Sequence, residues 1–336
     1  MVRFGIVGFG LHALKRLMPG FRLAQNARVT ALSRRDAERA RVSAAEHGIA
    51  HAFTSAEELC RSPEVDAVLV ATPNNCHLHD VLIALECGKP VLVEKPMAMN
   101  AGEARQMVGA AKRSGVLLGV AQVFRFAEST RRLRERVAAD EIGRVVYARS
   151  EFCYPGVSHP RTWLTDATIA GGGPIADVGV HCIDALRFIL DDEVTRVAAV
   201  RVSDADSGTV EASAMVSLEF RRSAIGAVMV STRAQYRTPL ELVGESGVLR
   251  ADDGLSVDKP VIIELRRGDE IETEQVLNHL AYARQVDAFA AAVEGRAAFP
   301  VPGEGGWKNQ VILDATYQSM RSGCAQAIES GDLAIG

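Results

Sequence analysis

An aspartate and a histidine near the middle of the chain have the types and the spacing that acid–base chemistry requires. Asp177 and His181 follow a glycine run at 171–173 and Pro174. A proline in this context is typical of the first position of a helix, and residues four apart on a helix lie on one face. A carboxylate can fix the tautomer of an imidazole that titrates near neutral pH. The spacing alone fits an acid–base pair and a purely structural contact equally well.

Lys95 ends an apolar run and is the second candidate for chemistry. The run over residues 91–94 lies between Gly88 and Pro96, which is typical of a short buried strand in a parallel sheet. Ligands of such sheets bind just beyond the carboxyl ends of the strands. Lys95 is therefore expected to place its ammonium near a bound ligand. An isolated lysine at the end of a strand is more often an ordinary surface residue than a functional one. Whether Lys95 has a function therefore depends on the other motifs of the chain.

The first residues of the chain carry a pattern that binds dinucleotides. A strand expected over residues 2–7 runs directly into Gly8-Phe9-Gly10-Leu11-His12-Ala13. Gly8 permits a tight turn, Gly10 lets the backbone approach a diphosphate, and Ala13 keeps the next helix close to the strand. The N-terminus of that helix, expected over 11–18, favours an anion. The pattern predicts a dinucleotide site built from Gly8, Phe9, Gly10 and Leu11.

The end of the second strand favours NADP over NAD. NAD sites usually place an acid there to bind the ribose 2′-hydroxyl, whereas an arginine accommodates a 2′-phosphate. In this chain Ser33 and Arg34 end the strand, and Asp36 follows only afterwards. Ser33 can donate one hydrogen bond, and Arg34 offers a charged fork that suits phosphate geometry. The alternative is that Arg34 lies over the adenine ring and that the protein also accepts NAD.

The elements that must position these residues fall into two patterns. Up to about residue 122, short apolar runs alternate with helical stretches, several of which end at a glycine. This alternation predicts βαβ units and a doubly wound parallel sheet. After Gln122, successive strands with short turns predict a mainly antiparallel open sheet. The fold class is therefore α/β, with a Rossmann-type dinucleotide-binding domain over 1–122 and a substrate-binding and oligomerisation domain over 123–336.

Two segments of the second domain carry specific expectations. A strand is expected over 211–220, with Ala, Val, Leu and Phe on one face and Glu, Ser and Met on the other. The apolar face should pack on helices, and the mixed face should meet solvent or another subunit. The last helix is expected over 307–322, after a loop at 300–306, and can pack back toward the N-terminal domain.

Composition limits the classes of function. The chain has 336 residues and a formal net charge of −4, which offers no footprint for nucleic acid. It holds no apolar run of the roughly 18 residues that a membrane span needs, and a strand expected from residue 2 leaves no room for a signal peptide. Its six cysteines show no spacing typical of a disulfide framework, as expected of reduced thiols in a cytoplasmic protein.

We expect no metal site, because neither His181 nor the pair His77 and His79 has a further ligand at a suitable spacing.

Taken together, these stretches resemble the glucose–fructose oxidoreductase / inositol dehydrogenase (Gfo/Idh/MocA) family of nicotinamide-dependent oxidoreductases. The resemblance covers nearly the whole chain. It rests on the N-terminal fingerprint, Ala71-Thr72-Pro73-Asn74 followed by His77, Glu94-Lys95-Pro96, and Asp177-Val178-Gly179-Val180-His181. It implies that Lys95, Asp177 and His181 form the catalytic set.

The resemblance also implies the residues that bind cofactor and substrate. Besides the fingerprint, Ser33 and Arg34, the cofactor is expected to contact Ala71, Thr72, Pro73, Asn74, His77, Glu94 and Lys95. The substrate is expected to contact Lys95, Arg125, Tyr154, Arg161, Trp163, Asp177 and His181. For Trp163, ordinary core packing is an equal alternative to substrate stacking.

The activity implied by the resemblance is reversible hydride transfer between NADP and a carbinol carbon of a sugar, cyclitol or related polyol. In oxidation, His181 would act as the base, Lys95 would stabilise the developing alkoxide, and Asp177 would orient substrate or imidazole. Two alternatives stay open: a reductase of a dihydrodiol or tetrapyrrole on the same fold, and a catalytically silent NADP sensor. Because closed two-fold assemblies dominate among oligomers, we expect a homodimer or homotetramer.

Overall fold

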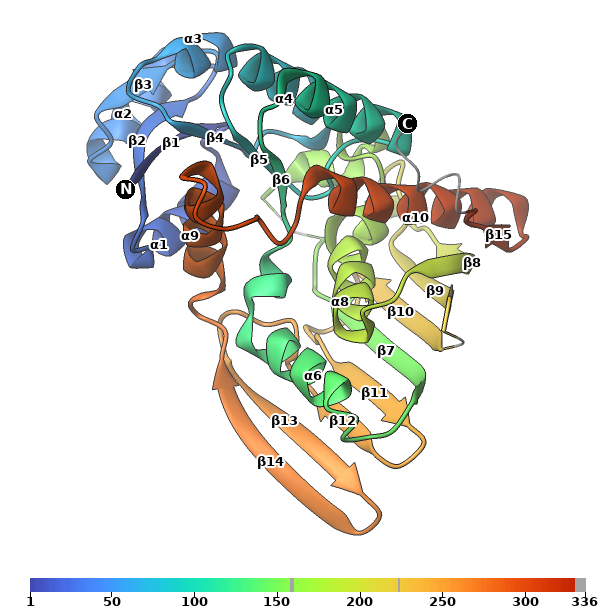
Figure 1. Cartoon of the computed structure of the whole chain (residues 1–336). Coiled ribbons are helices and arrows are strands. Elements are labelled where there is room, and N and C mark those ends of the chain that lie inside the picture. The colour runs from blue at the N-terminus through green and yellow to red at the C-terminus, as the bar shows by residue number, and fades with distance from the viewer. Residues whose placement is uncertain (158–159, 223, 330–336) are drawn as a thin grey trace. The chain divides into compact units, whose positions relative to one another are not determined.

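The computed structural model describes residues 1–157, 160–222 and 224–329. The chain forms two compact units (Figure 1). Among the described residues, the first contains 1–122 together with 282–310, and the second contains 123–281 and 311–329. The segment 282–310 follows most of the second unit in sequence and yet packs within the first.

Within the described residues, the first unit is built on a six-stranded sheet in the order β3-β2-β1-β4-β5-β6. All of its strand pairs are parallel. The strands are β1 (Val2–Val7), β2 (Ala27–Ser33), β3 (His51–Phe53), β4 (Ala67–Val70), β5 (Val91–Glu94) and β6 (Leu118–Ala121). The doubly wound parallel sheet expected from the sequence is confirmed.

Helices cover both faces of this sheet, which explains why β4, β5 and β6 are buried at every residue. The ring of Phe4 on β1 contacts Phe21 and Phe289 on one side, whereas the next residue, Gly5, faces Leu59 on the other (Figure 1). The helices of this unit are η1 (Ala13–Leu17), α1 (Met18–Leu23), α2 (Ala37–His47), α3 (Ala56–Arg61), η2 (Asn74–Cys76), α4 (His77–Glu86), α5 (Ala101–Ser114) and α9 (Ala281–Val293).

The second unit, as far as it is described, is built on a nine-stranded sheet in the order β14-β13-β12-β11-β7-β10-β9-β8-β15. Strands β7 and β10 pair in parallel, and the other pairs are antiparallel. The strands are β7 (Val145–Cys153), β8 (Val194–Val202), β9 (Ser213–Phe220), β10 (Ile225–Ser231), β11 (Leu240–Gly244), β12 (Val248–Ala251), β13 (Pro260–Arg267), β14 (Glu270–Leu277) and β15 (Gln326–Ala327). The expected mainly antiparallel sheet is confirmed.

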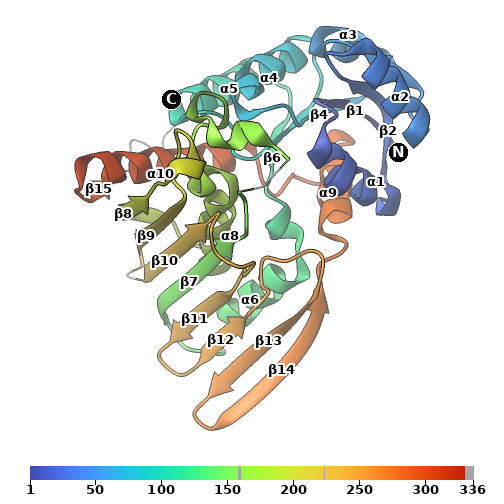
Figure 2. The same ribbon diagram turned by 180° about the vertical axis from the view of Figure 1, so that it is seen from behind.

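One face of the second sheet packs on helices α6 and α8, and its opposite face is open among the described elements (Figure 2). The helical elements of this unit are η3 (Val123–Phe126), α6 (Glu128–Ala138), η4 (Thr162–Thr165), α7 (Ala167–Ala170), η5 (Ile175–Gly179), α8 (Val180–Leu190) and η6 (Ala205–Ser207). Helix α10 (Gly303–Ser322) begins in the first unit and ends in the second.

Strand β9 corrects one expectation. The alternation is confirmed from Ala214 to Phe220, where the apolar side chains are buried and Met215 and Glu219 are exposed. The strand, however, begins at Ser213 and not at residue 211. Glu211 was expected on the mixed face, but it is 1% exposed. Its carboxylate accepts hydrogen bonds from the backbone N–H groups of Gly173 and Ile175, so Glu211 is buried before the strand begins.

Helix α10 begins at Gly303, four residues before the position expected from the sequence. Its first turn lies against β6, where a Cβ at Gly306 would overlap the side chain of Val120. Glycines in this turn therefore allow a close approach of helix and strand, and do not mark a loop.

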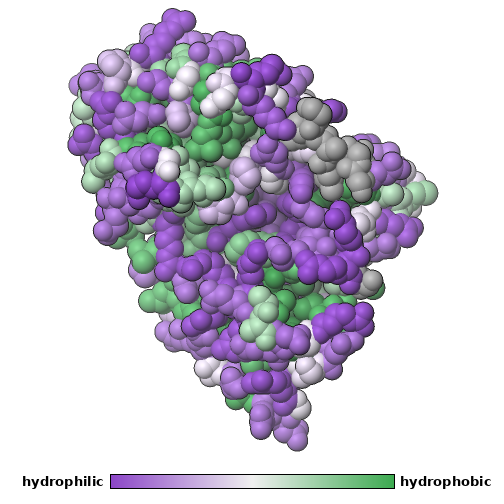
Figure 3. All heavy atoms as spheres, viewed as in Figure 1, coloured by the Kyte–Doolittle hydropathy of each residue, from purple (hydrophilic) through white to green (hydrophobic). Residues whose placement is uncertain are grey.

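The face of the molecule shown in Figure 3 is mainly hydrophilic, with hydrophobic residues exposed in smaller groups. Among the described helices, none combines the length and the hydropathy that crossing a bilayer requires.

Candidate active site

The fingerprint loop leaves room for a ligand beside its backbone. Gly8 has φ +84°, and a Cβ there would lie 2.6 Å from the Thr72 nitrogen, so only glycine fits. At Gly10, apart from the chain neighbours, a Cβ would meet no atom nearer than the Gly8 carbonyl oxygen, 3.9 Å away. An open backbone at the start of a helical segment fits an anionic diphosphate.

The other fingerprint residues hold this loop in place. Phe9 is 1% exposed, its ring lies 5.7 Å from that of His47, and its N–H donates to the Ser33 carbonyl oxygen at 3.0 Å. Leu11 is half-buried, and Ala13 is buried under the helix. Gly8 and Gly10 thus supply the open backbone, while Phe9 anchors the loop to the core.

The end of β2 presents an arginine, and the nearest acid is already engaged. Ser33 is buried, and Arg34 is half-buried with its Nη1 donating to Ser43 Oγ at 2.7 Å. Asp36 is the N-cap of α2, where its carboxylate accepts a hydrogen bond from the Arg39 N–H at 2.9 Å. A capping carboxylate stabilises the start of its helix. Asp36 therefore already has a structural role here.

His77 joins the loops that follow β4 and β5. Its side chain has no exposed surface, and its ring nitrogens lie 2.9 Å from the Thr72 carbonyl oxygen and 3.0 Å from that of Pro96. Burial lowers the pKa of His77, although both carbonyl contacts favour its protonated form. His77 therefore holds the Thr72 loop close to Pro96, and its expected contact with the cofactor stays a prediction.

The remaining residues of this loop lie nearer the surface. Ala71, Thr72 and Pro73 are half-buried, and Asn74 is buried. The Thr72 hydroxyl donates to Asp80 Oδ2 at 2.7 Å, which fixes its orientation.

Lys95 follows the buried strand β5, as the sequence indicates, and its side chain is half-buried. The preceding residue, Glu94, has its Oε1 2.9 Å from Nε2 of His12 in the fingerprint loop. Burial raises the pKa of Glu94, but the charge and hydrogen bond of His12 and the charge of Lys95 outweigh it and hold that pKa below its usual value. Glu94 therefore links the fingerprint loop to the end of β5 as a buried anion.

Asp177 and His181 belong to the second unit and are both 8% exposed. Residues 175–179 form a π-helical turn that leads into α8. The sequence predicted a regular α-helix from Pro174, with Asp177 and His181 one turn apart on one face. The wider turn, in which hydrogen bonds run from residue i to i+5, changes that spacing, and such turns are frequent at functional sites.

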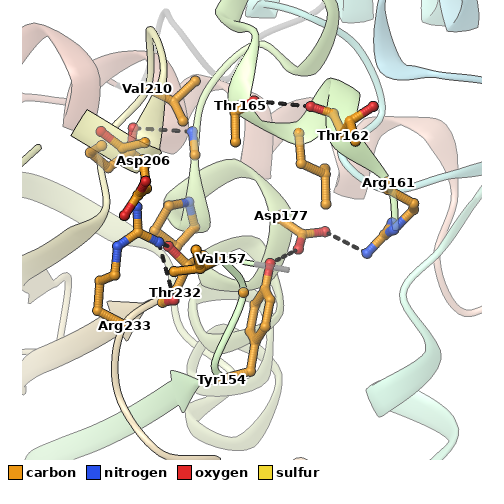
Figure 4. A pocket seen from close by; sticks show the side chains of 16 residues that line it. Tyr154, Val157, Arg161, Thr162, Thr165, Asp177, Asp206, Val210, Thr232 and Arg233 are labelled. Atoms are coloured by element: carbon orange, nitrogen blue, oxygen red, sulfur yellow. Dashed lines mark hydrogen bonds and ion pairs between the residues drawn. The ribbon is translucent and has the colours of Figure 1, made fainter. Parts of the chain in front are cut away.

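Asp177 has a hydrogen-bond donor and an ion-pair partner in the segment before the glycine run (Figure 4). Tyr154 Oη donates to Asp177 Oδ2 at 2.7 Å, and Arg161 Nη2 lies 3.7 Å from Asp177 Oδ1. Burial and then the Asp177 charge raise the pKa of Tyr154 well above its usual range, so its hydroxyl keeps the proton that it donates. The structure thus brings together three residues that the sequence proposed for the substrate side.

His181 is held between two aromatic rings. The ring of Phe124 meets it edge-on at a centroid distance of 4.9 Å, and the ring of Phe152 lies nearly parallel at 6.3 Å. These contacts restrict the rotation of the imidazole.

A pocket of about 200 Å³ opens onto Asp177. Figure 4 shows Tyr154, Arg161 and Asp177 on one side of it and Thr232 and Arg233 on another. Trp163 contacts Arg161, which lines the pocket: the Arg161 guanidinium carbon lies 5.8 Å from the centroid of the Trp163 ring system.

The sequence missed several residues that line this pocket: Asp206, Glu211, Thr232 and Arg233. Arg233 donates to both carboxylate oxygens of Asp204, at 2.7 and 2.6 Å. These residues come from the loop between β8 and β9 and from the end of β10, and only the tertiary fold places them beside Asp177. No local sequence signal marks them.

Arg125 has a structural partner in the second unit. Its guanidinium makes a two-pronged contact with the buried carboxylate of Asp184, at 2.8 and 2.7 Å, and lies over the Phe188 ring. Arg125 therefore ties η3 to α8, and its expected contact with the substrate stays a prediction. Among the described residues, no group of three His, Cys, Asp or Glu side chains is arranged to hold a metal ion.

Comparisons with known proteins match both halves of the chain. The model of the oxidoreductase family with an NAD-binding Rossmann fold (GFO/IDH/MocA) matches residues 2–122, and that of the GFO/IDH/MocA C-terminal domain matches residues 130–250. The chain is 33% identical to 1,5-anhydro-D-fructose reductase of Ensifer adhaerens, over 98% of this chain and 100% of that protein. It is 30% identical to D-xylose 1-dehydrogenase (NADP(+)) 2 of Haloferax volcanii, over 97% and 99% of the two chains.

A solved structure has the same fold. The aldose-aldose oxidoreductase of Caulobacter crescentus, complexed with glycerol, is similar with a TM-score of 0.90 and 23% identity, over 97% of this chain and 99% of that one.

Proposed function

This chain belongs to the Gfo/Idh/MocA family of NAD(P)-dependent oxidoreductases, and on that premise we propose that it is an NADP-preferring dehydrogenase or reductase of a sugar, cyclitol or related polyol. Bound NADP supplies the hydride acceptor or donor for a carbinol or carbonyl carbon. Two relatives that match nearly the whole chain are named for sugar substrates, which supports this substrate class.

The observation that carries the proposal is the setting of Asp177. A buried carboxylate with a phenol and a guanidinium beside it opens into a pocket lined by both polar and apolar side chains. The polar side chains include donors and acceptors, which suit the hydroxyl groups of a polyol, since each hydroxyl both donates and accepts. A purely structural carboxylate would not need to face a pocket.

Each catalytic residue has a role that its chemistry supports. In the direction of oxidation, His181 accepts the hydroxyl proton as a general base, because a neutral imidazole has the right proton affinity near pH 7. Lys95 donates a hydrogen bond from Nζ to the oxygen on which charge develops. Asp177, with Tyr154 and Arg161 on its two oxygens, orients the substrate.

The proposed preference for NADP rests on the two residues at the end of β2. Arg34 and Ser33 are proposed to bind the 2′-phosphate, because a guanidinium fork matches phosphate geometry. An acid that could bind a free 2′-hydroxyl is expected in NAD sites, and the nearest candidate, Asp36, caps α2. The open backbone at Gly8 and Gly10 would hold the diphosphate, and the loop from Ala71 to Asn74 would line the ribose of the nicotinamide.

The two parts of the chain are proposed to have different functions. Residues 1–122 are proposed to bind the cofactor, and residues 123–336 to bind the substrate and to mediate assembly. Lys95 comes from the first of these segments, and Asp177 and His181 come from the second. The three are proposed to act on one substrate.

A panel of sugars, cyclitols and aldonolactones, scored by the absorbance of NADPH in both directions, tests the proposal. Turnover of at least one polyol with NADP is the expected result. A trans-dihydrodiol in the same panel tests the alternative on the same fold, and turnover of that compound alone would replace the polyol substrate class. Tight NADP binding without turnover of any compound would favour a cofactor sensor and contradict the enzymatic proposal.

A further inference from the structure

Glu211 is a buried acid outside the residues assigned to catalysis. It lies between η6 and β9, is 1% exposed, and borders the pocket that opens onto Asp177. A buried carboxylate requires hydrogen-bond donors, since burying an unpartnered charge is costly. The identity of its donors indicates what Glu211 does.

The donors of Glu211 lie at the start of the helical segment that carries Asp177. Its Oε2 accepts from the Gly173 N–H at 3.1 Å, and its Oε1 accepts from the Ile175 N–H at 3.0 Å. The first N–H groups of a helix have no partner within the helix, and a negative charge there is favoured by the helix dipole. Glu211 therefore caps the segment from outside, although it is 36 residues away in the sequence.

One hydrogen-bonded chain connects Glu211 to the backbone of Asp177. Gly173 donates its N–H to Glu211, and its carbonyl oxygen accepts the Asp177 N–H at 3.0 Å. These two groups belong to the peptide units on either side of the Gly173 Cα, so Gly173 is fixed from both directions. A shift of the Glu211 carboxylate would therefore be transmitted to the backbone of Asp177 through a single residue.

A tyrosine from α10 completes the arrangement. Tyr317 Oη donates to Glu211 Oε1 at 3.1 Å, and burial and then the Glu211 charge raise the pKa of Tyr317 well above its usual value. The glycine run is shaped to these two side chains, since a Cβ at Gly172 would overlap the Tyr317 hydroxyl and one at Gly173 would overlap the Glu211 backbone. The glycines thus allow an acid and a phenol to reach the backbone ahead of Asp177.

From these contacts we propose that Glu211 is a positioning residue for catalysis, which fixes Asp177 by holding the Gly173 and Ile175 N–H groups. This inference rests on the proposed function, because it gives Glu211 a part in the turnover carried by Asp177 and His181. Glu211 acts through the backbone, and Tyr317 holds its carboxylate.

The variant Glu211→Gln tests this role with little change of shape. The glutamine amide can accept from one N–H, but its NH₂ group then faces the other donor. We expect kcat with the best substrate of the panel to fall by about 10-fold to 100-fold, because small misplacements of catalytic groups have effects of this size. The Kd for NADP should not change. Tyr317→Phe removes only one of the three donors and should cause a smaller loss in the same direction.

Glu219→Gln is the matched control. It makes the same chemical change on β9, at a side chain that is 56% exposed and pairs with Arg196. Its kcat should equal that of the parent. Hydrogen exchange of the backbone over residues 171–181, followed by mass spectrometry, provides a readout independent of activity, and it should accelerate in Glu211→Gln and remain parental in Glu219→Gln.

The outcomes separate this inference from the proposed function. Parental exchange in Glu211→Gln, or faster exchange with parental kcat, would overturn the positioning role. If the parent protein turns over no compound, the proposed function fails by itself, and the exchange over residues 171–181 alone decides whether Glu211 holds Asp177. An unchanged exchange rate in Glu211→Gln would then contradict the claim that Glu211 fixes the backbone of Asp177, and a faster exchange would support it.

Discussion

Tyr154, the residue that follows β7, donates a hydrogen bond to Asp177, with 2.7 Å between Tyr154 Oη and Asp177 Oδ2. This bond joins the chain just after β7 to the π-helical turn that carries the acid. A phenol whose pKa is raised in this way stays a donor throughout the physiological range. The bond therefore holds the Asp177 carboxyl group in one orientation.

Tyr154→Phe should reduce kcat without unfolding the protein. A hydrogen bond to a charged group contributes about 1.5–3 kcal/mol, which corresponds to a loss of about 10-fold to 100-fold if the bond acts in the transition state. Steady-state kinetics with the best polyol measures it. Tyr147→Phe makes the same change earlier on β7 and serves as the control. Parental kcat and KM in Tyr154→Phe would show that the bond is structural only.

The cofactor preference can be tested at Arg34. Arg34→Ala should weaken NADP binding by about 1.5–3 kcal/mol, the usual size of a charge-assisted hydrogen bond, and leave NAD binding nearly unchanged. Fluorescence titration gives both dissociation constants. Arg22→Ala, at an exposed position of α1, controls for loss of a positive charge. If the parent binds NADP and NAD equally well, the assignment of Arg34 to the 2′-phosphate is wrong.

The fold should lose stability in mild acid because of His77. Burial lowers the pKa of His77, so the native state binds a proton less readily than the unfolded chain, in which histidine titrates near ~6.5. The stabilising contribution is therefore present above about pH 6.5 and is lost as the pH falls toward the lowered pKa of the native state.

Thermal unfolding at a series of pH values below neutrality measures this effect. The Tm of the parent should fall more steeply with acid than that of His77→Gln, whose side-chain amide can still donate to the carbonyl oxygens. His79→Gln makes the same change at an exposed site on the same helix and should keep the parental slope. Equal slopes in the parent and His77→Gln would contradict the role assigned to burial.

Much of the fold could be predicted because its signals are local. The strand at 91–94 was predicted with its observed bounds, since a short apolar run between a glycine and a proline admits few other structures. By contrast, β14 carries side chains that are mostly exposed and shows no apolar face, so its sequence resembles a loop. It forms a strand because β13 pairs with it.

The candidate site could be predicted only in part. Its motif residues follow local patterns, and the structure does bring Tyr154 and Arg161 to Asp177. The π-helical turn at 175–179 could not be foreseen, because no local pattern distinguishes it from an α-helical turn. The hydrogen bonds from Gly173 and Ile175 to Glu211, a residue far away in the sequence, were likewise hidden. The pairing of Arg125 with the buried carboxylate of Asp184 also could not be foreseen, because the two residues are far apart in the sequence.

The open face of the second sheet should mediate assembly. Met215 on β9 stands opposite Val200 on β8 and Met229 on β10, and Val200 and Met215 are 68% and 51% exposed. Exposed apolar rows of this kind mark protein interfaces. We expect a homodimer or a homotetramer through this face, so Met215→Glu should reduce the mass measured by light scattering.

Val42→Glu, at an exposed position on α2, is the control for that experiment and should leave the mass unchanged. A parent protein that is monomeric at high concentration would contradict the assignment of this face.

The turnover of Lys95→Ala and His181→Ala, measured beside their affinity for NADP, tests the central claim most directly. Proton transfer by a placed group contributes about 10²–10⁴-fold to a rate, so both variants should lose turnover on that scale. Their NADP dissociation constants should stay near the parental value. His181→Ala should also remove one ionisation from the pH–rate profile of oxidation. Parental turnover in both variants would contradict the claim that these residues catalyse the reaction.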